Sequence, residues 1–157
     1  METLQTRNDL IEHGDLACLI AVDVPETQSV AIEQFTQLGF GIHTALSSEE
    51  FTTKFHANPY DVIVISEQLG ACDVDTNPAI AELVVLSPIQ RRELFVVLIG
   101  PNMVSRSEMQ AFHYSVDITV NQADAHELKT IAGRGILKQE EFYAAFNSVL
   151  KAMRAGG

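Results

Sequence analysis

The chain has 157 residues, of which 46% are hydrophobic and 20% are charged, so it can bury a real core and suits one compact domain. Its formal net charge of -11 repels phosphate backbones and anionic lipids, which argues against a general nucleic-acid or membrane surface. No apolar run in the sequence approaches the length needed to cross a bilayer. We therefore predict a protein that binds neither nucleic acid nor membrane.

The N-terminal segment and the cysteines bear on the compartment. Residues 1–15 are polar and lack the apolar core of a secretory signal peptide. Cys18 lies in an apolar run, where we expect a buried thiol, and Cys72 lies in a polar stretch. Two cysteines so far apart make neither a disulfide framework nor a zinc ribbon. We expect the protein to work in a reducing cytoplasm.

The first half of the chain alternates apolar runs with amphipathic stretches. The runs at 16–22, 40–46 and 61–65 predict strands, and the first and third are nearly continuous Val, Ile and Leu. Such runs are typical of parallel strands whose two faces are both covered by helices. Residues 25–38 carry one apolar stripe, and residues 47–57 open with cap-type residues, so both segments predict helices.

The second half continues the same alternation. Residues 67–76 show no periodic pattern, and we expect a mobile loop there. The last helical region is predicted from about residue 123 to 154, with a bend or interruption at Gly133–Gly135. The other predicted elements are a helix from Asn77–Pro78 to about residue 90, a strand at 94–99, a short helix capped by Ser105 or Ser107 and ending at residue 113, and a strand at 116–120.

Strand and helix, repeated five times, predict a doubly wound parallel α/β sheet. Open sheets of this kind usually place a ligand site at the carboxyl ends of their strands. We expect a single domain over residues 1–157, with its core at 16–132 and a helical extension at 136–154.

Several phrases of the sequence occur in an order and spacing that resemble the receiver domain of response regulators, the CheY-like domain. They are LIAVDVPE, LSSEEFTTKFHANPYDVIVIS, FVVLIG and FHYSVDITVNQADAHEL, and the likeness covers about residues 17–131. The resemblance implies a flavodoxin-like, three-layer sandwich with five parallel strands in the order 2-1-3-4-5.

The resemblance also implies a phosphorylation site, which needs an aspartate nucleophile, acids that bind Mg²⁺, a hydroxyl and a lysine. In this sequence those positions have changed. One acid, Asp23, remains beside Val24, while Ser66 stands at the aspartate, Gly100 at the hydroxyl and Asn121 at the lysine. The aromatic switch position of the family falls on Ile118. We therefore predict a degenerate pseudo-receiver with a vestigial site, no catalytic residue, no bound metal and no cofactor.

Two of these residues have other interpretations. Ser66 could be a nucleophile or a modified residue, but it lacks the surroundings of a hydrolase elbow, so we favour a structural, hydrogen-bonded serine. Asp23 could bind a cation, but we favour a cap of the helix that begins at Pro25. Glu67 and Asp23 alone would make a poor Mg²⁺ site.

The C-terminal segment carries apolar residues at helical spacing, among them Phe142 and Phe146. This stripe packs on its own sheet or offers an apolar face to a second copy or another protein. By resemblance to receiver dimers, the predicted interaction surface comprises Met109, Tyr114, Phe142 and Phe146. The predicted function is a non-catalytic signalling module that binds proteins in a two-component-type or related bacterial pathway. The alternatives are a small-ligand sensor that uses the vestigial crevice and, more weakly, an enzyme of unknown reaction.

Overall fold

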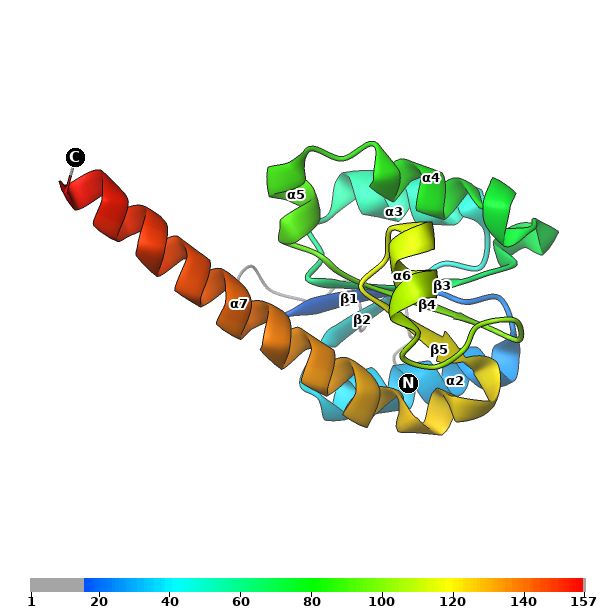
Figure 1. Cartoon of the computed structure of the whole chain (residues 1–157). Coiled ribbons are helices and arrows are strands. Elements are labelled where there is room, and N and C mark those ends of the chain that lie inside the picture. Colours follow the sequence, from blue (N-terminus) through cyan, green and yellow to red (C-terminus); the bar gives the residue numbers. More distant parts are fainter. Residues whose placement is uncertain (1–15, 157) are drawn as a thin grey trace.

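Five parallel strands form one sheet, hydrogen-bonded in the predicted order β2-β1-β3-β4-β5 (Figure 1). The computed structural model describes residues 16–156, so the predicted polar segment 1–15 lies outside the described residues. The strands are β1 (Ala17–Ala21), β2 (Gly41–Thr44), β3 (Val62–Ser66), β4 (Phe95–Gly100) and β5 (Ile118–Asn121).

Helices connect the strands, and most begin where the sequence predicted. The predicted helix from residue 77 to 90 is in fact two helices, because Ser87 starts a second one through a capping box and Pro88 occupies its first turn. The unpatterned loop contains two short 3-10 segments. The helical elements are α2 (Pro25–Gln37), α3 (Ser48–Ala57), η1 (Leu69–Ala71), η2 (Val74–Thr76), α4 (Pro78–Val84), α5 (Pro88–Arg92), α6 (Glu108–Tyr114), η3 (Gln122–Glu127) and α7 (Leu128–Gly156).

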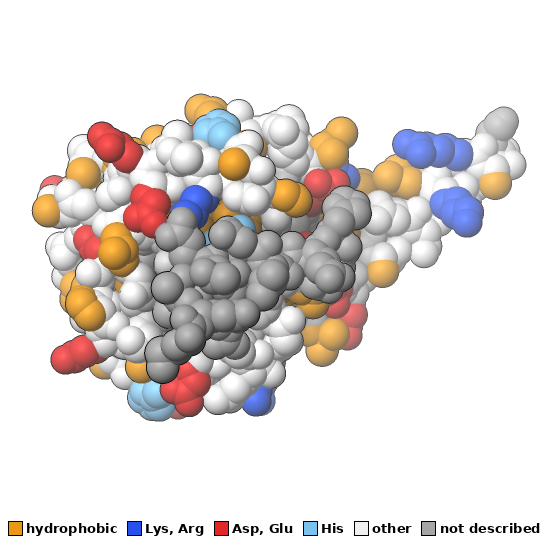
Figure 2. Space-filling view, turned by 180° about the vertical axis from the view of Figure 1, so that it is seen from behind, with side chains coloured by type: hydrophobic (Ala, Val, Ile, Leu, Met, Phe, Trp, Pro, Cys, Tyr) orange, Lys and Arg blue, Asp and Glu red, His pale blue; other side chains and the backbone are white. Residues whose placement is uncertain are grey.

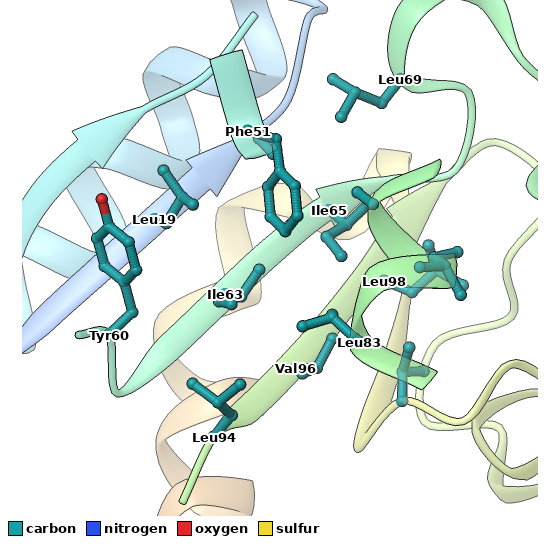
Figure 3. Close-up of a cluster of buried hydrophobic side chains, with 14 of the residues drawn as sticks. Leu19, Phe51, Tyr60, Ile63, Ile65, Leu69, Leu83, Leu94, Val96 and Leu98 are labelled. Carbon is teal, nitrogen blue, oxygen red and sulfur yellow. The ribbon is translucent and has the colours of Figure 1, made fainter. Parts of the chain in front are cut away.

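The sheet separates two hydrophobic clusters, because alternate residues of each strand point to opposite faces. One cluster lies beneath α3 and α4, as the close-up in Figure 3 shows. The other lies beneath α2 and the first turns of α7. The central strands β1, β3 and β4 are buried at every residue, which explains their continuous apolar sequences. Burying one such side chain fully contributes roughly 1.5–3 kcal/mol.

The long helix α7 runs without interruption through Gly133–Gly135, so the predicted bend is wrong. Gly135 has a packing role instead. A Cβ atom at this position would lie 2.5 Å from Cζ of Phe95, so only glycine lets the helix pass this close to the first residue of β4. At Gly133 a Cβ atom would meet Leu38 at 3.5 Å, an ordinary contact distance.

Within residues 16–156, no helix is both long enough and apolar enough to span a membrane.

Candidate functional site at the carboxyl ends of the strands

The parallel register places the predicted site residues along one edge of the sheet. Ser66 ends β3 and pairs with Ile99, and Gly100 ends β4 and pairs with Asn121 of β5. Asp23 and Val24 follow β1, the other neighbour of β3. The structure therefore gathers all five residues of the predicted vestigial site at one edge of the sheet.

The side chain that fills this edge belongs to Glu67, which the sequence analysis treated only as a poor Mg²⁺ ligand. Glu67 is only 2% exposed, and its carboxylate accepts two hydrogen bonds from Asn102. The backbone N–H of Asn102 donates to Oε1 at 2.7 Å, and its side-chain Nδ2 donates to Oε2 at 3.2 Å. Burial of this charged group is tolerated because both oxygens have donors.

Gly100 makes room for Glu67. A Cβ atom at position 100 would lie 2.0 Å from Oε1 and 2.4 Å from Cδ of that glutamate, distances that no side chain can adopt. The end of β4 therefore carries glycine, and no hydroxyl residue, because the side chain of Glu67 fills the space that a larger residue would need. A sequence signal existed, namely a large acid beside one strand end and a glycine at the next, but its meaning required the register.

Asp23 does not cap the following helix, so that prediction is wrong. Val24 is the N-cap residue of α2, and no side chain caps this helix. The carboxylate of Asp23 instead accepts a hydrogen bond from the backbone N–H of Gly70 at 3.1 Å. Asp23 thus ties the end of β1 to the loop after β3, where Gly70 has a positive φ of 72°.

Ser66 is 5% exposed, and its hydroxyl forms no hydrogen bond within residues 16–156, which differs from the predicted hydrogen-bonded serine side chain. Its backbone carbonyl accepts one from Nδ2 of Asn77 at 2.9 Å, and the carbonyl of Glu67 accepts a second at 3.2 Å. The side-chain oxygen of Asn77 also accepts from the N–H of Ala79 and so caps α4. Asn77, buried to 2% exposure, therefore fixes the backbone on which Ser66 and Glu67 stand, a role that the sequence analysis missed.

Asn121, predicted to stand at the lysine position, connects two loops. Its Nδ2 donates to the carbonyl of Met103 at 2.8 Å, and its Oδ1 accepts from the N–H of Ala123 at 2.9 Å, which caps η3. The loop after β4 is thus held from two sides, by the carboxylate of Glu67 at residue 102 and by the amide of Asn121 at residue 103.

The residues predicted as the switch position and the interaction surface lie elsewhere. Ile118 is half-buried and packs against the cluster beneath α2 and α7. Tyr114 is partly buried and packs against the opposite cluster. Met109 is 85% exposed on α6, while Phe142 and Phe146 lie together on α7 with stacked rings. Of the four residues predicted as one surface, three are therefore exposed and Tyr114 is partly buried.

Within the described part of the chain, no cluster of three or more His, Cys, Asp or Glu side chains could hold a metal ion. The two acids at the strand ends, Asp23 and Glu67, both accept hydrogen bonds from backbone N–H groups of neighbouring loops. They act here as structural ties.

Solved structures of receiver domains have the same architecture. The receiver domain of the Francisella response regulator 1452 matches with a TM-score of 0.60 and 18% identity, over 79% of this chain and 98% of that one. A CheY-like receiver domain protein from Methanospirillum hungatei matches with a TM-score of 0.63 and 10% identity, over 82% and 98%. This chain has the receiver fold.

A third solved structure matches a larger share of this chain. It is a chain in which a trimeric coiled-coil segment of yeast Spc42 is fused to another structure, with a TM-score of 0.58 and 20% identity. It covers 93% of this chain and 94% of that one. No protein-family model matches the sequence, and no curated protein matches it.

Proposed function

We propose that this receiver-fold chain is a non-catalytic signalling module of a two-component-type or related bacterial pathway. It acts by binding proteins, it is not phosphorylated on aspartate, and it uses no metal or cofactor. The receiver fold supports the signalling role, and the strand-end residues support the loss of phosphotransfer.

One observation carries the proposal: the carboxylate of Glu67 occupies the volume above Gly100. In a phosphorylated receiver, a hydroxyl at this strand end and a lysine at the next hold the phosphoryl oxygens. Here a buried anion stands in that volume, and Asn121 uses its amide on neighbouring loops. A phosphoryl group placed beside Glu67 would meet like charge without a compensating ammonium.

The same observation weakens the ligand-sensor alternative, because a small molecule would have to displace a hydrogen-bonded side chain. Thermal-shift measurements with nucleotides and small organic acids test that alternative directly. A stabilisation that saturates with one of these compounds, and that is lost on substitution of Glu67, would favour a sensor.

Protein binding is proposed for the face formed by α6, β5 and α7. We propose a receiver core at residues 16–132 and a helical extension at 136–154 as the two functional parts. The fused coiled coil in one structural neighbour supports the idea that this fold is compatible with a helical oligomerisation segment. A homodimer through α7 and a cytoplasmic location complete the proposal.

The decisive experiment is incubation of the whole chain with acetyl phosphate and Mg²⁺, followed by intact-mass measurement. A parallel NMR titration uses beryllofluoride with Mg²⁺, and an active receiver domain serves as the positive control. We expect no mass increase and no specific shift changes near Ser66. A stable adduct on this chain would refute the proposal.

A further inference from the structure

The C-terminal helix α7 extends well beyond the rest of the domain (Figure 1). It has 29 residues and is therefore about 44 Å long at 1.5 Å per residue. Its buried residues, Leu128, Ile131 and Ala132, all lie in its first turns. Gln139 still contacts the domain, because its side-chain N–H donates to the carbonyls of Arg92 and Leu94 at 3.3 and 3.0 Å. The rest of the helix projects away from the sheet, and its C-terminal end lies far from the domain (Figure 1).

The projecting part carries an exposed apolar seam, defined as Phe142, Phe146, Val149 and Met153. These side chains are 64%, 40%, 58% and 67% exposed, respectively. Their successive spacings of four, three and four residues are those of a coiled-coil seam, which faces another helix. Most of the stability of a protein helix comes from packing of its apolar face, so burial of the seam against another helix would stabilise the projecting part.

A groove beside the seam provides a second wall. It has a volume of about 770 Å³ and runs between α5 and α7. Ile89 of α5 is 65% exposed on this side, and the guanidinium of Arg92 lies 5.7 Å from the ring centroid of Phe146. A helix laid on the seam would therefore contact α5 as well as α7.

The distribution of charge indicates which helix could bind the seam. The described domain, residues 16–135, carries 15 acidic and 6 basic side chains, whereas beyond Glu141 the helix carries only Lys151 and Arg154 as charged residues. Neither of these cations forms an ion pair within residues 16–156. Figure 2 shows basic side chains gathered near the outer end of the projecting helix. Because α7 is one continuous helix, its basic end points away from its own acidic domain.

We propose that the seam of α7 binds the same seam on a second copy of this chain, with the two helices antiparallel. The antiparallel direction brings the basic end of each helix towards the acidic domain of the other copy and buries both seams. A parallel pair would instead place four cations side by side at the exposed end. This inference rests on the homodimer proposed above and gives the residues that meet and the direction of the helices, but it does not depend on the loss of phosphorylation.

Sedimentation velocity and light scattering on the full chain test the dimer. The chain has a mass of 17.2 kDa, and we expect about twice that mass at a protein concentration of tens of micromolar. The variant Val149→Glu/Met153→Glu should raise the dissociation constant at least 100-fold. Its matched control, Ala144→Glu/Ser148→Glu, adds the same charge to exposed positions away from the seam and should stay dimeric.

Circular dichroism and thermal unfolding of the seam variant at low concentration check that its domain remains folded, since both substituted positions are exposed. A wild-type chain that stays monomeric at 100 µM, or a seam variant as dimeric as its control, would overturn the proposal.

Ionic strength tests the direction of the helices. Raising the salt concentration from 50 to 500 mM should weaken the antiparallel dimer several-fold, because it screens attraction between the basic helix end and the acidic domain. A dimer that tightens with salt would show that attraction between the helix end and the acidic domain does not hold it, and would overturn the antiparallel arrangement. Failure of either test leaves the phosphorylation experiment unaffected, so the two proposals can fail separately.

Discussion

Glu67 and Gly100, on neighbouring strand ends, share one volume: the carboxylate of the first fills the space that a side chain on the second would need. The arrangement is stable because Asn102 donates two hydrogen bonds to that carboxylate. It also fixes the loop after β4. The two residues should therefore be energetically coupled.

Gly100→Ala tests this coupling. The new Cβ atom would collide with Glu67, so we expect the free energy of unfolding to fall by about 2 kcal/mol. In the background of Glu67→Ala the same substitution should cost less than about 0.5 kcal/mol, because the obstructing side chain is gone. Urea unfolding of the wild type, the two single variants and the double variant gives the double-mutant cycle. An equal loss of unfolding free energy on Gly100→Ala in both backgrounds would refute a shared volume.

Two glycines of α7 should respond in opposite directions to alanine. Gly133→Ala meets only an ordinary contact and gains helix propensity, so we expect stabilisation by about 0.5–1 kcal/mol. Gly135→Ala forces a Cβ atom into the ring of Phe95 and should destabilise the protein by about 1–3 kcal/mol. Thermal unfolding measures both, and each variant serves as the control for the other. Stabilisation by both would show that α7 does not pass so close to β4.

Alkaline pH should destabilise the fold through Tyr60. Burial raises the pKa of Tyr60 from 10 to about 12, and its hydroxyl shares a hydrogen bond with His43 at 2.6 Å. Because the folded pKa lies above the unfolded one, this stability is present below pH 10 and is lost as pH rises to 12. The loss should total about 2–3 kcal/mol. In Tyr60→Phe the free energy of unfolding should depend less on pH across this window, as measured by urea unfolding at each pH. An equal pH dependence in that variant would exclude Tyr60 as the cause.

The two thiols should differ sharply in reactivity. Cys18 is fully buried in β1, and burial raises the pKa of its thiol well above the ordinary value, with the nearby Asp61 adding to the effect. Cys72 is half-exposed in the loop after β3. We expect a thiol reagent to label one cysteine per native chain rapidly and both in urea. Cys72→Ser should abolish the rapid phase, whereas a persisting rapid phase would mean that β1 opens readily.

The sequence was sufficient for the order of elements because the local signals were strong. The buried strands appear as continuous Val, Ile and Leu, and Ser47, Asn77 and Ser107 cap helices near where they were expected. It missed the break before α5 and wrongly predicted a bend at Gly133–Gly135, because a glycine pair weakens helix propensity while tertiary contacts determine the outcome. Propensity alone cannot reveal that Phe95 lies against the helix.

At the strand ends, the sequence by itself determined which chemical groups are absent, since residue identity fixes whether a position carries a carboxylate, a hydroxyl or an ammonium group. Only the tertiary structure decided what those positions do instead. Asp23 contacts Gly70, and Glu67 lies over Gly100, because parallel pairing brings together residues that are more than 30 positions apart. Such contacts depend on strand register and side-chain volume in three dimensions, which leave no local periodic pattern in the chain.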